Sequence, residues 1–172
     1  MSLQPQPAYV IPEETRRVAH AAFPKGVLCL RLVEVLGHLY LDEQFAALFP
    51  TRGQPAASPA RLALVVVLQY VEGLSDRQAA DAVRGRIDWK YARGLELTDP
   101  GFDHTVLSEF RARLVSKDAD RLLLDTLLER LRKLGLIKQQ GRQRTDSTYV
   151  LAAVRRLNRL ERVGETMRAA LS

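Results

Sequence analysis

Glycine, serine and proline residues divide the middle of the chain into short helices, and this punctuation constrains the fold more than any other feature. Ser58-Pro59 is a strong helix start, because a hydroxyl caps the first free N–H groups and proline fits the first helical position. Gly73 ends that helix, and the spacing from Ser75 to Gln78 is a capping box that begins the next. The pattern predicts three short helices, separated by Gly73 and Gly85, over residues 58–72, 76–84 and 88–93.

Apolar side chains at helical spacing predict more helices on both sides of this region. On the N-terminal side we expect a helix over residues 27–39, followed by a short turn that Asp42 caps. On the C-terminal side we expect helices over residues 105–115 and 117–134. Gly135 ends the last of these and places Leu136 for a Schellman contact with Leu131. The predicted fold class is mainly α, a helical bundle with a helix-turn-helix-like core.

The two ends of the chain differ from this helical pattern. Residues 1–26 carry four prolines and predict an extended lead-in. After a linker at 137–141, the β-branched and aromatic residues at 145–150 favour a short strand, and a helical stretch follows. The expected division is therefore a lead-in at 1–26, a helical domain at 27–136, the linker at 137–141, and a further unit at 142–172.

A single cysteine, Cys29, limits the compartment in which this chain folds. One cysteine cannot form a disulfide framework within the chain, which fits a reducing cytosol. Its position between two leucines predicts a buried, inert thiol. The first residues lack a signal-peptide pattern, and the longest apolar run, at 62–68, is too short to span a bilayer. We therefore expect a cytoplasmic chain with no membrane partner.

Basic charge is concentrated toward the C-terminus. The net charge is +6, yet residues 1–100 hold 11 Lys/Arg against 11 Asp/Glu, whereas residues 101–172 hold 15 against 9. A basic region of this kind suits a polyanion, because each phosphate contact releases condensed counterions. The alternative is an ordinary solvated surface. The charge distribution favours nucleic acid as the partner.

Basic residues on helix ends and exposed faces of the helix-turn-helix-like region are the candidate DNA contacts. Each alone is more often a solvated surface charge, but together they predict a track along duplex DNA. Trp89 and Tyr91 could stack on bases, although anchoring a short helix to the core is the more frequent role. The candidate contacts are Arg77, Arg84, Arg86, Lys90, Arg93, Arg111 and Arg113, with Arg142 and Arg144 in the basic approach to the predicted strand.

Asp146 is the one serious candidate for chemistry. The chain has no Gly-rich phosphate loop and no Cys/His cluster, and His104 has no second ligand at metal spacing. His104 and Asp103 are better explained as part of the N-terminal cap of the helix that follows. Asp146 instead lies on the predicted strand directly after a basic run, where metal-dependent phosphoryl-transfer sites often begin. A lone aspartate there is also frequently structural.

Four segments follow one another along the chain: GQPA at 53–56, LQYVEGLSDRQAA at 68–80, DWKY at 88–91 and FDHTVLSEFR at 102–111. In this order they resemble the N-terminal domain of bacterial insertion-sequence transposases of the Asp-Asp-Glu class. The resemblance covers roughly residues 25–172. The succession of the segments makes it far more specific than any single one.

The resemblance implies a helical domain followed by a ribonuclease-H-like catalytic domain that holds Mg²⁺. Thr145-Asp146-Ser147-Thr148 matches the position of the first acid of the triad, so Asp146 would be a catalytic metal ligand. This family often has histidine where the chain has Tyr149. Two Mg²⁺ ions need several carboxylate oxygens, and only Glu161 and Glu165 follow Asp146. We therefore expect a truncated catalytic domain that is inactive alone and binds no cofactor tightly.

Three functional hypotheses follow. In the first, the chain is the DNA-binding portion of a transposase, recognising double-stranded DNA at the terminal inverted repeats of its element in the bacterial nucleoid. In the second, the helices form an oligomerisation or scaffold module without DNA specificity of its own, possible as a homodimer through the Leu-rich helix at 117–134. In the third and weakest, the chain is an intact small nuclease that uses Asp146.

Overall fold

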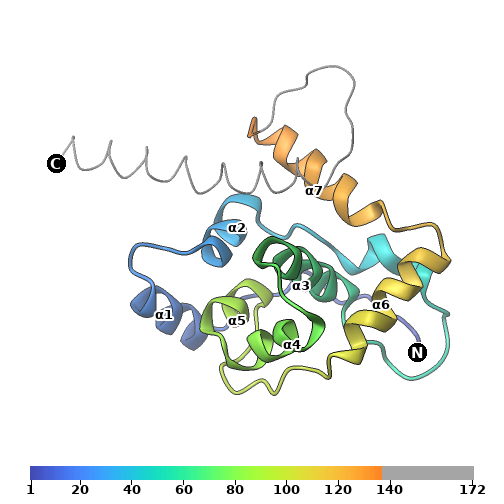
Figure 1. Cartoon of the computed structure of the whole chain (residues 1–172), viewed down its shortest axis with the longest axis horizontal. Coiled ribbons are helices and arrows are strands. Elements are labelled where there is room, and N and C mark those ends of the chain that lie inside the picture. The colour runs from blue at the N-terminus through green and yellow to red at the C-terminus, as the bar shows by residue number, and fades with distance from the viewer. Residues whose placement is uncertain (137–172) are drawn as a thin grey trace.

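The computed structural model describes residues 1–136, and this part of the chain is a bundle of helices (Figure 1). The predicted linker at 137–141 and the unit at 142–172, with its strand, Asp146, Arg142 and Arg144, lie outside the described residues. Between residues 1 and 136 there is no β-strand, only an isolated parallel bridge between Ser2 and Pro55. The elements are α1 (Glu13–Ala22), α2 (Leu28–Leu36), the 3-10 helix η1 (Asp42–Leu48), α3 (Pro59–Glu72), α4 (Asp76–Gly85), α5 (Ile87–Arg93), α6 (Thr105–Ser116) and α7 (Leu122–Lys133). The mainly α prediction is confirmed for this part of the chain.

Helix α3 lies at the centre of the bundle, and its start and end are set as the sequence predicts. Ser58 Oγ accepts a hydrogen bond from the Arg61 N–H at 3.3 Å, and Pro59 occupies the first helical turn. Gly73 ends the helix in the left-handed conformation, at φ 67°. Most side chains of α3 are buried, and the helix contacts η1, α4 and α6. The apolar run at 62–68 is therefore a core helix, as predicted.

Asp42 has a different role from the one expected. Its carboxylate does not cap its own turn; it accepts hydrogen bonds from Ser58 Oγ at 2.7 Å and from the Ala60 N–H at 3.1 Å, at the start of α3. The second carboxylate oxygen accepts from the Gln6 N–H at 3.1 Å. Asp42 is buried, so three donors compensate for the loss of water around the charge. It thereby joins the N-terminal segment, η1 and α3.

The extended lead-in expected over residues 1–26 is wrong in its second half, because Glu13–Ala22 forms α1. Two acids in the first turn stabilise the positive end of this helix. Tertiary contacts then hold it: Thr15 Oγ1 donates to the Leu95 carbonyl at 2.7 Å, and Ala19 is fully buried where α1 packs on α5. The four prolines favoured the prediction of an extended segment, whereas the stability of α1 comes from its tertiary contacts.

The first twelve residues run across the helical domain. Ser2 pairs with the loop before α3 through backbone hydrogen bonds to Gln54 and Ala56. Further along, the Tyr9 hydroxyl donates to the Ala92 carbonyl at 2.6 Å. The Tyr9 ring lies against Gly94, which has φ 60° and where a Cβ would collide with the ring. Glycine at position 94 therefore both ends α5 and makes room for this segment.

Helix α7 begins five residues later than predicted. Asp118 has a positive φ of 53°, and the Ala119 N–H donates to the Leu114 carbonyl at 2.8 Å, so residues 117–121 form a turn after α6. The predicted end of α7 is confirmed, because the Leu136 N–H donates to the Leu131 carbonyl at 2.9 Å, the hydrogen bond of a Schellman motif. The leucines that α7 buries in the core are Leu123, Leu127, Leu128 and Leu131.

Among the described helices, none has the length and apolar character needed to cross a membrane.

Candidate nucleic-acid interface

Helices α3 and α4, which lie in the region predicted to be helix-turn-helix-like, are joined by only three residues, Gly73, Leu74 and Ser75 (Figure 1). The predicted capping box begins α4: Ser75 Oγ accepts from the Gln78 N–H at 3.3 Å, and Gln78 Oε1 accepts from the Ser75 N–H at 2.8 Å. One face of α4 is alanine and valine, buried where α4 packs on α3, α5 and α6. The opposite face is exposed and polar, with Arg77, Gln78, Asp81 and Arg84.

A polar clamp of Gln69, Asp76 and Arg111 fixes the angle between α3, α4 and α6. Gln69 Nε2 donates to Asp76 Oδ1 at 2.7 Å, and an Arg111 guanidinium N–H donates to Asp76 Oδ2 at 2.6 Å. The hydrogen bond from Arg111 is the largest cause that lowers the pKa of Asp76. Arg111 was predicted to contact DNA, but its guanidinium here holds the turn that presents α4.

Arg86 is likewise engaged inside the domain. Its guanidinium donates to Asp88 Oδ1 and Oδ2 at 3.0 and 2.6 Å, and also to both carboxylate oxygens of Glu72. The Trp89 indole N–H donates to Glu72 Oε1 at 3.1 Å, and the Arg86 guanidinium lies 5.4 Å from the Trp89 ring centroid. Hydrogen bonds to Asp88 raise the pKa of Arg86. This network joins the end of α3 to the start of α5.

Lys90 and Arg93 are buried, with 3% and 5% of their surface exposed, which removes them from the predicted DNA track. Lys90 Nζ donates to the Asp99 carbonyl at 2.6 Å, and burial lowers the pKa of Lys90. The Arg93 guanidinium lies 5.0 Å from the Phe102 ring centroid, and burial lowers the pKa of Arg93 to about 10. Both cations hold the loop between α5 and α6 against α5. A phosphate cannot contact them without displacing that loop.

Trp89 and Tyr91 are buried, with 0% and 3% of their surface exposed. The anchoring role is therefore confirmed for both rings, and neither ring has an open face for a base. Asp103 is confirmed as a cap of α6, since its carboxylate accepts from the Thr105 N–H at 2.9 Å. His104 is the residue before α6, and its Nδ1 lies 3.5 Å from Asp103 Oδ1.

The remaining candidates lie at the surface in two places. Arg77 and Arg84 share the exposed face of α4; Arg84 contacts Asp81 Oδ1 and the Pro100 carbonyl at 3.3 Å each. Arg77 makes no hydrogen bond or ion pair within residues 1–136, and its charge contributes to the lowered pKa of Asp103. Arg113, on α6, is half-buried over the Phe49 ring and donates to the Leu48 carbonyl at 3.3 Å. Arg77 and Arg84 thus lie on one face of α4. The exposed candidate residues within residues 1–136 do not form one continuous basic track.

Exposed cations also lie outside the α3–α4 pair, at positions that the sequence pattern did not indicate. Residues 1–136 hold 18 Lys/Arg and 17 Asp/Glu, so almost all of the basic excess belongs to residues 137–172. Their position in loops gave no periodic signal that could have identified them. The overlooked exposed residues in loops include Arg52 in the loop before α3 and Lys117 and Arg121 in the turn before α7.

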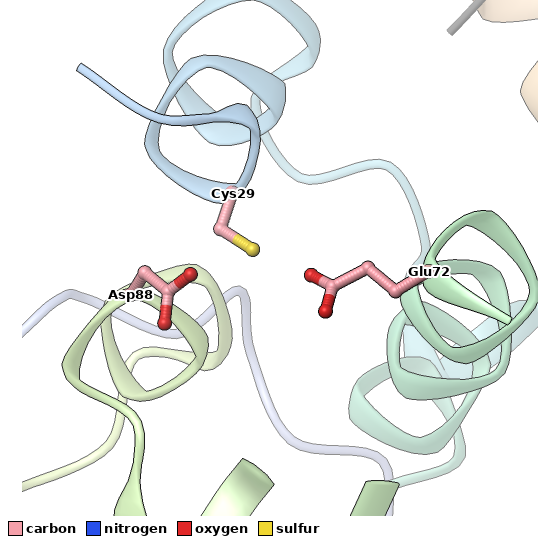
Figure 2. Close-up of side chains that lie close together, drawn as sticks. All are labelled: Cys29, Glu72 and Asp88. Atoms are coloured by element: carbon pink, nitrogen blue, oxygen red, sulfur yellow. The ribbon is translucent and has the colours of Figure 1, made fainter. Parts of the chain in front are cut away.

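Cys29, Glu72 and Asp88 form the one group within residues 1–136 whose ligand atoms could meet around a metal ion (Figure 2). Their side chains come from α2, α3 and α5 and point toward one another, with all ligand atoms within 4.8 Å. The arrangement does not fit a metal ion, because the Arg86 guanidinium already neutralises and hydrogen-bonds both carboxylates. Burial raises the pKa of the Cys29 thiol, which keeps it protonated. The prediction of a buried, inert cysteine is therefore supported by its surroundings.

A known protein family matches the part of the chain that contains these helices. A family model described as "Transposase domain (DUF772)" matches residues 17–113, from α1 into α6. Comparison with curated proteins and with solved structures gave no match. The matched region includes the α3–α4 pair, the clamp around Asp76 and the Arg86 network. Because the match spans more than half of its residues, the chain belongs to the transposase domain (DUF772) family.

Proposed function

We propose that this chain is the N-terminal DNA-binding portion of a bacterial insertion-sequence transposase of the Asp-Asp-Glu class. It binds the duplex DNA of the element's terminal inverted repeats. The observation that carries the proposal is the exposed polar face of α4, held on a fixed turn inside a transposase-family domain. Helix-turn-helix proteins place the second helix of such a pair in the major groove.

The electrostatics of α4 support this orientation. Arg77 lies in the first turn, where recognition helices contact base edges and phosphates, and its guanidinium makes no hydrogen bond or ion pair within residues 1–136. Arg84 lies two turns further along the same face, and its partner Asp81 is itself exposed. An exposed ion pair of this kind stabilises the fold by less than about 1 kcal/mol, so a phosphate can replace the aspartate at small cost.

The C-terminal residues contribute much of the charge in this proposal. Arg142 and Arg144 belong to residues 137–172, which hold 8 Lys/Arg against 3 Asp/Glu. The helical domain is nearly neutral, so it supplies shape and a few contacts, and this segment supplies nonspecific attraction. The full chain is therefore expected to bind DNA with a higher affinity than the contacts of α4 alone would give.

A salt titration of the full chain on duplex DNA tests the proposal. Contacts by Arg77, Arg84, Arg142 and Arg144 would give a slope of log K against log salt of about −3 to −4. The readout is fluorescence anisotropy of labelled duplexes, with an element-end duplex and a scrambled duplex of the same length. No binding at low salt, or binding insensitive to salt, contradicts the proposal.

The alternative function is a helical oligomerisation module that forms a homodimer, and the Leu-rich sequence of α7 is the feature that favours it. Leu123, Leu127, Leu128 and Leu131 of α7 already pack in the core of the domain itself. Light scattering separates the two functions. A stable dimer whose mass and affinity ignore DNA favours the module, whereas a DNA-dependent complex favours the DNA-binding domain.

For catalysis we propose that Asp146 is the first ligand of a Mg²⁺ site that the full-length parent completes. Mg²⁺ binds carboxylate oxygens in near-octahedral geometry, and a two-metal site requires more carboxylates than Asp146 alone provides. The chain alone is therefore expected not to cleave DNA. Nicking that depends on Mg²⁺ and disappears in Asp146→Asn would revive the hypothesis of an intact nuclease.

A further inference from the structure

An apolar groove of about 250 Å³ lies between α3 and α7. Its lining side chains are aliphatic or aromatic except for the carboxylate of Asp120. On the α3 side, the Tyr70 ring is 46% exposed although α3 is otherwise the central core helix. The exposed ring and the apolar groove walls together present a contiguous apolar surface to a further apolar element. The lining residues are Val66, Val67, Tyr70, Asp120, Leu123, Leu124 and Leu127.

The sequence that follows α7 contains an apolar seam with no assigned partner. Between residues 153 and 171, small or apolar residues recur at alternating intervals of four and three, which is the spacing of a helix seam that packs against another helical surface. Arginines flank the seam, and the charged residue in the groove, Asp120, is acidic. The seam positions are Ala153, Leu157, Leu160, Gly164, Met167 and Leu171.

The connection between groove and seam is long enough for both to belong to one chain. The segment leaves from Leu136, directly after α7, which forms one wall of the groove. Sixteen residues separate Leu136 from Ala153. An extended chain of that length reaches about 50 Å, whereas the groove lies about 15 Å back along α7. Attachment to the same chain gives the seam an effective concentration in the millimolar range.

We propose that residues 153–171 of the same chain dock their apolar seam into the groove between α3 and α7. Docking covers Tyr70 and Leu124 and brings the basic C-terminal region beside the helical domain. The inference does not depend on DNA binding: it requires only the groove, the seam and the length of the connection. The docking can therefore be correct or wrong independently of the proposed function.

Disulfide trapping in the full chain tests this docking. Tyr70→Cys combined with Leu160→Cys places one thiol in the groove and one on the seam. Arg17→Cys combined with Leu160→Cys is the matched control, because Arg17 is exposed on α1, which lies across the bundle from α7 (Figure 1). Cys29 does not interfere, since it is 1% exposed. Non-reducing electrophoresis and mass spectrometry of tryptic peptides measure the initial rate of disulfide formation within and between chains.

We expect the groove pair to form an intrachain disulfide about tenfold faster than the control pair, at a rate independent of protein concentration. Adding Leu157→Asp on the seam lowers that rate to the control level, while Arg162→Gln off the seam leaves it unchanged. Both substitutions lie outside the helical domain, so they leave its fold intact. Equal rates for the two pairs, or a disulfide mainly between chains, would overturn the proposal.

Discussion

Arg111 on α6 donates a hydrogen bond of 2.6 Å to the carboxylate of Asp76, the first residue of α4. These two residues belong to different segments of the transposase-like pattern, and the contact joins them across 35 positions of sequence. Gln69 of α3 completes the clamp through the other carboxylate oxygen. The short turn between α3 and α4 therefore has its geometry fixed by a partner on a third helix.

Replacing Arg111 by alanine should destabilise the domain by about 1–2 kcal/mol, because Asp76 then keeps a half-buried charge without its cation. Urea unfolding followed by circular dichroism measures the change. The control is Lys133→Ala, which removes the exposed pair between Lys133 and Glu129 and should leave the free energy of unfolding almost unchanged. If the two variants lose the same small stability, the clamp does not hold the fold.

The clamp also predicts a pH dependence in acid. The hydrogen bond from Arg111 lowers the pKa of Asp76 in the folded state below its ordinary value of 3.8. The resulting stability is present above the unfolded pKa and is lost as the pH falls through the folded pKa. Wild type should therefore exceed Asp76→Asn in unfolding free energy at neutral pH, and the difference should shrink below about pH 4. A difference that stays constant from neutral pH into acid would contradict this assignment.

Helix boundaries set by local chemistry could be predicted from the sequence. Ser58-Pro59 and the Ser75–Gln78 capping box act within one helical turn, so the start of α3 and that of α4 were found correctly. Helix α1 was missed because Thr15 donates to the Leu95 carbonyl, just after α5, and α1 packs on α5 itself; no local pattern reveals such contacts between distant residues. The late start of α7 was missed for a related reason, since the turn at 117–121 continues a helical composition.

The candidate site was harder to predict. The sequence gives the charge of each arginine or lysine on a helix, but it does not give the carboxylate or carbonyl that the side chain contacts in the fold. Arg86 and Arg111 are used by carboxylates that follow or precede them at irregular distances in sequence. Lys90 and Arg93 are covered by the loop between α5 and α6, and their burial depends on how that loop folds. Only Arg77 and Arg84 keep the exposed place on α4 that their spacing indicated.

The surroundings of Cys29, Glu72 and Asp88 predict that the stability of the chain does not depend on a metal ion bound by this group. Every carboxylate already accepts hydrogen bonds from Arg86, so a metal ion would have to displace a guanidinium and deprotonate a thiol whose pKa is raised. Neither EDTA nor equimolar Zn²⁺ should change the thermal unfolding midpoint of the full chain. A saturable rise with Zn²⁺ that disappears in Cys29→Ser would show that the group binds metal after all.

Arg77 gives the most direct test of α4 as the DNA-reading helix. Arg77→Gln removes an exposed charge that has no hydrogen bond or ion pair within residues 1–136, so stability should hardly change. If Arg77 contacts a phosphate, the salt slope of duplex binding should become shallower by about one unit. Arg17→Gln is the matched control, because it removes an equal exposed charge on α1 and should leave that slope unchanged. Equal effects of the two substitutions would mean that the chain attracts DNA through net charge alone. A shallower slope in Arg77→Gln only would place the contact at the start of α4, the position that the clamp of Asp76 and Arg111 holds fixed.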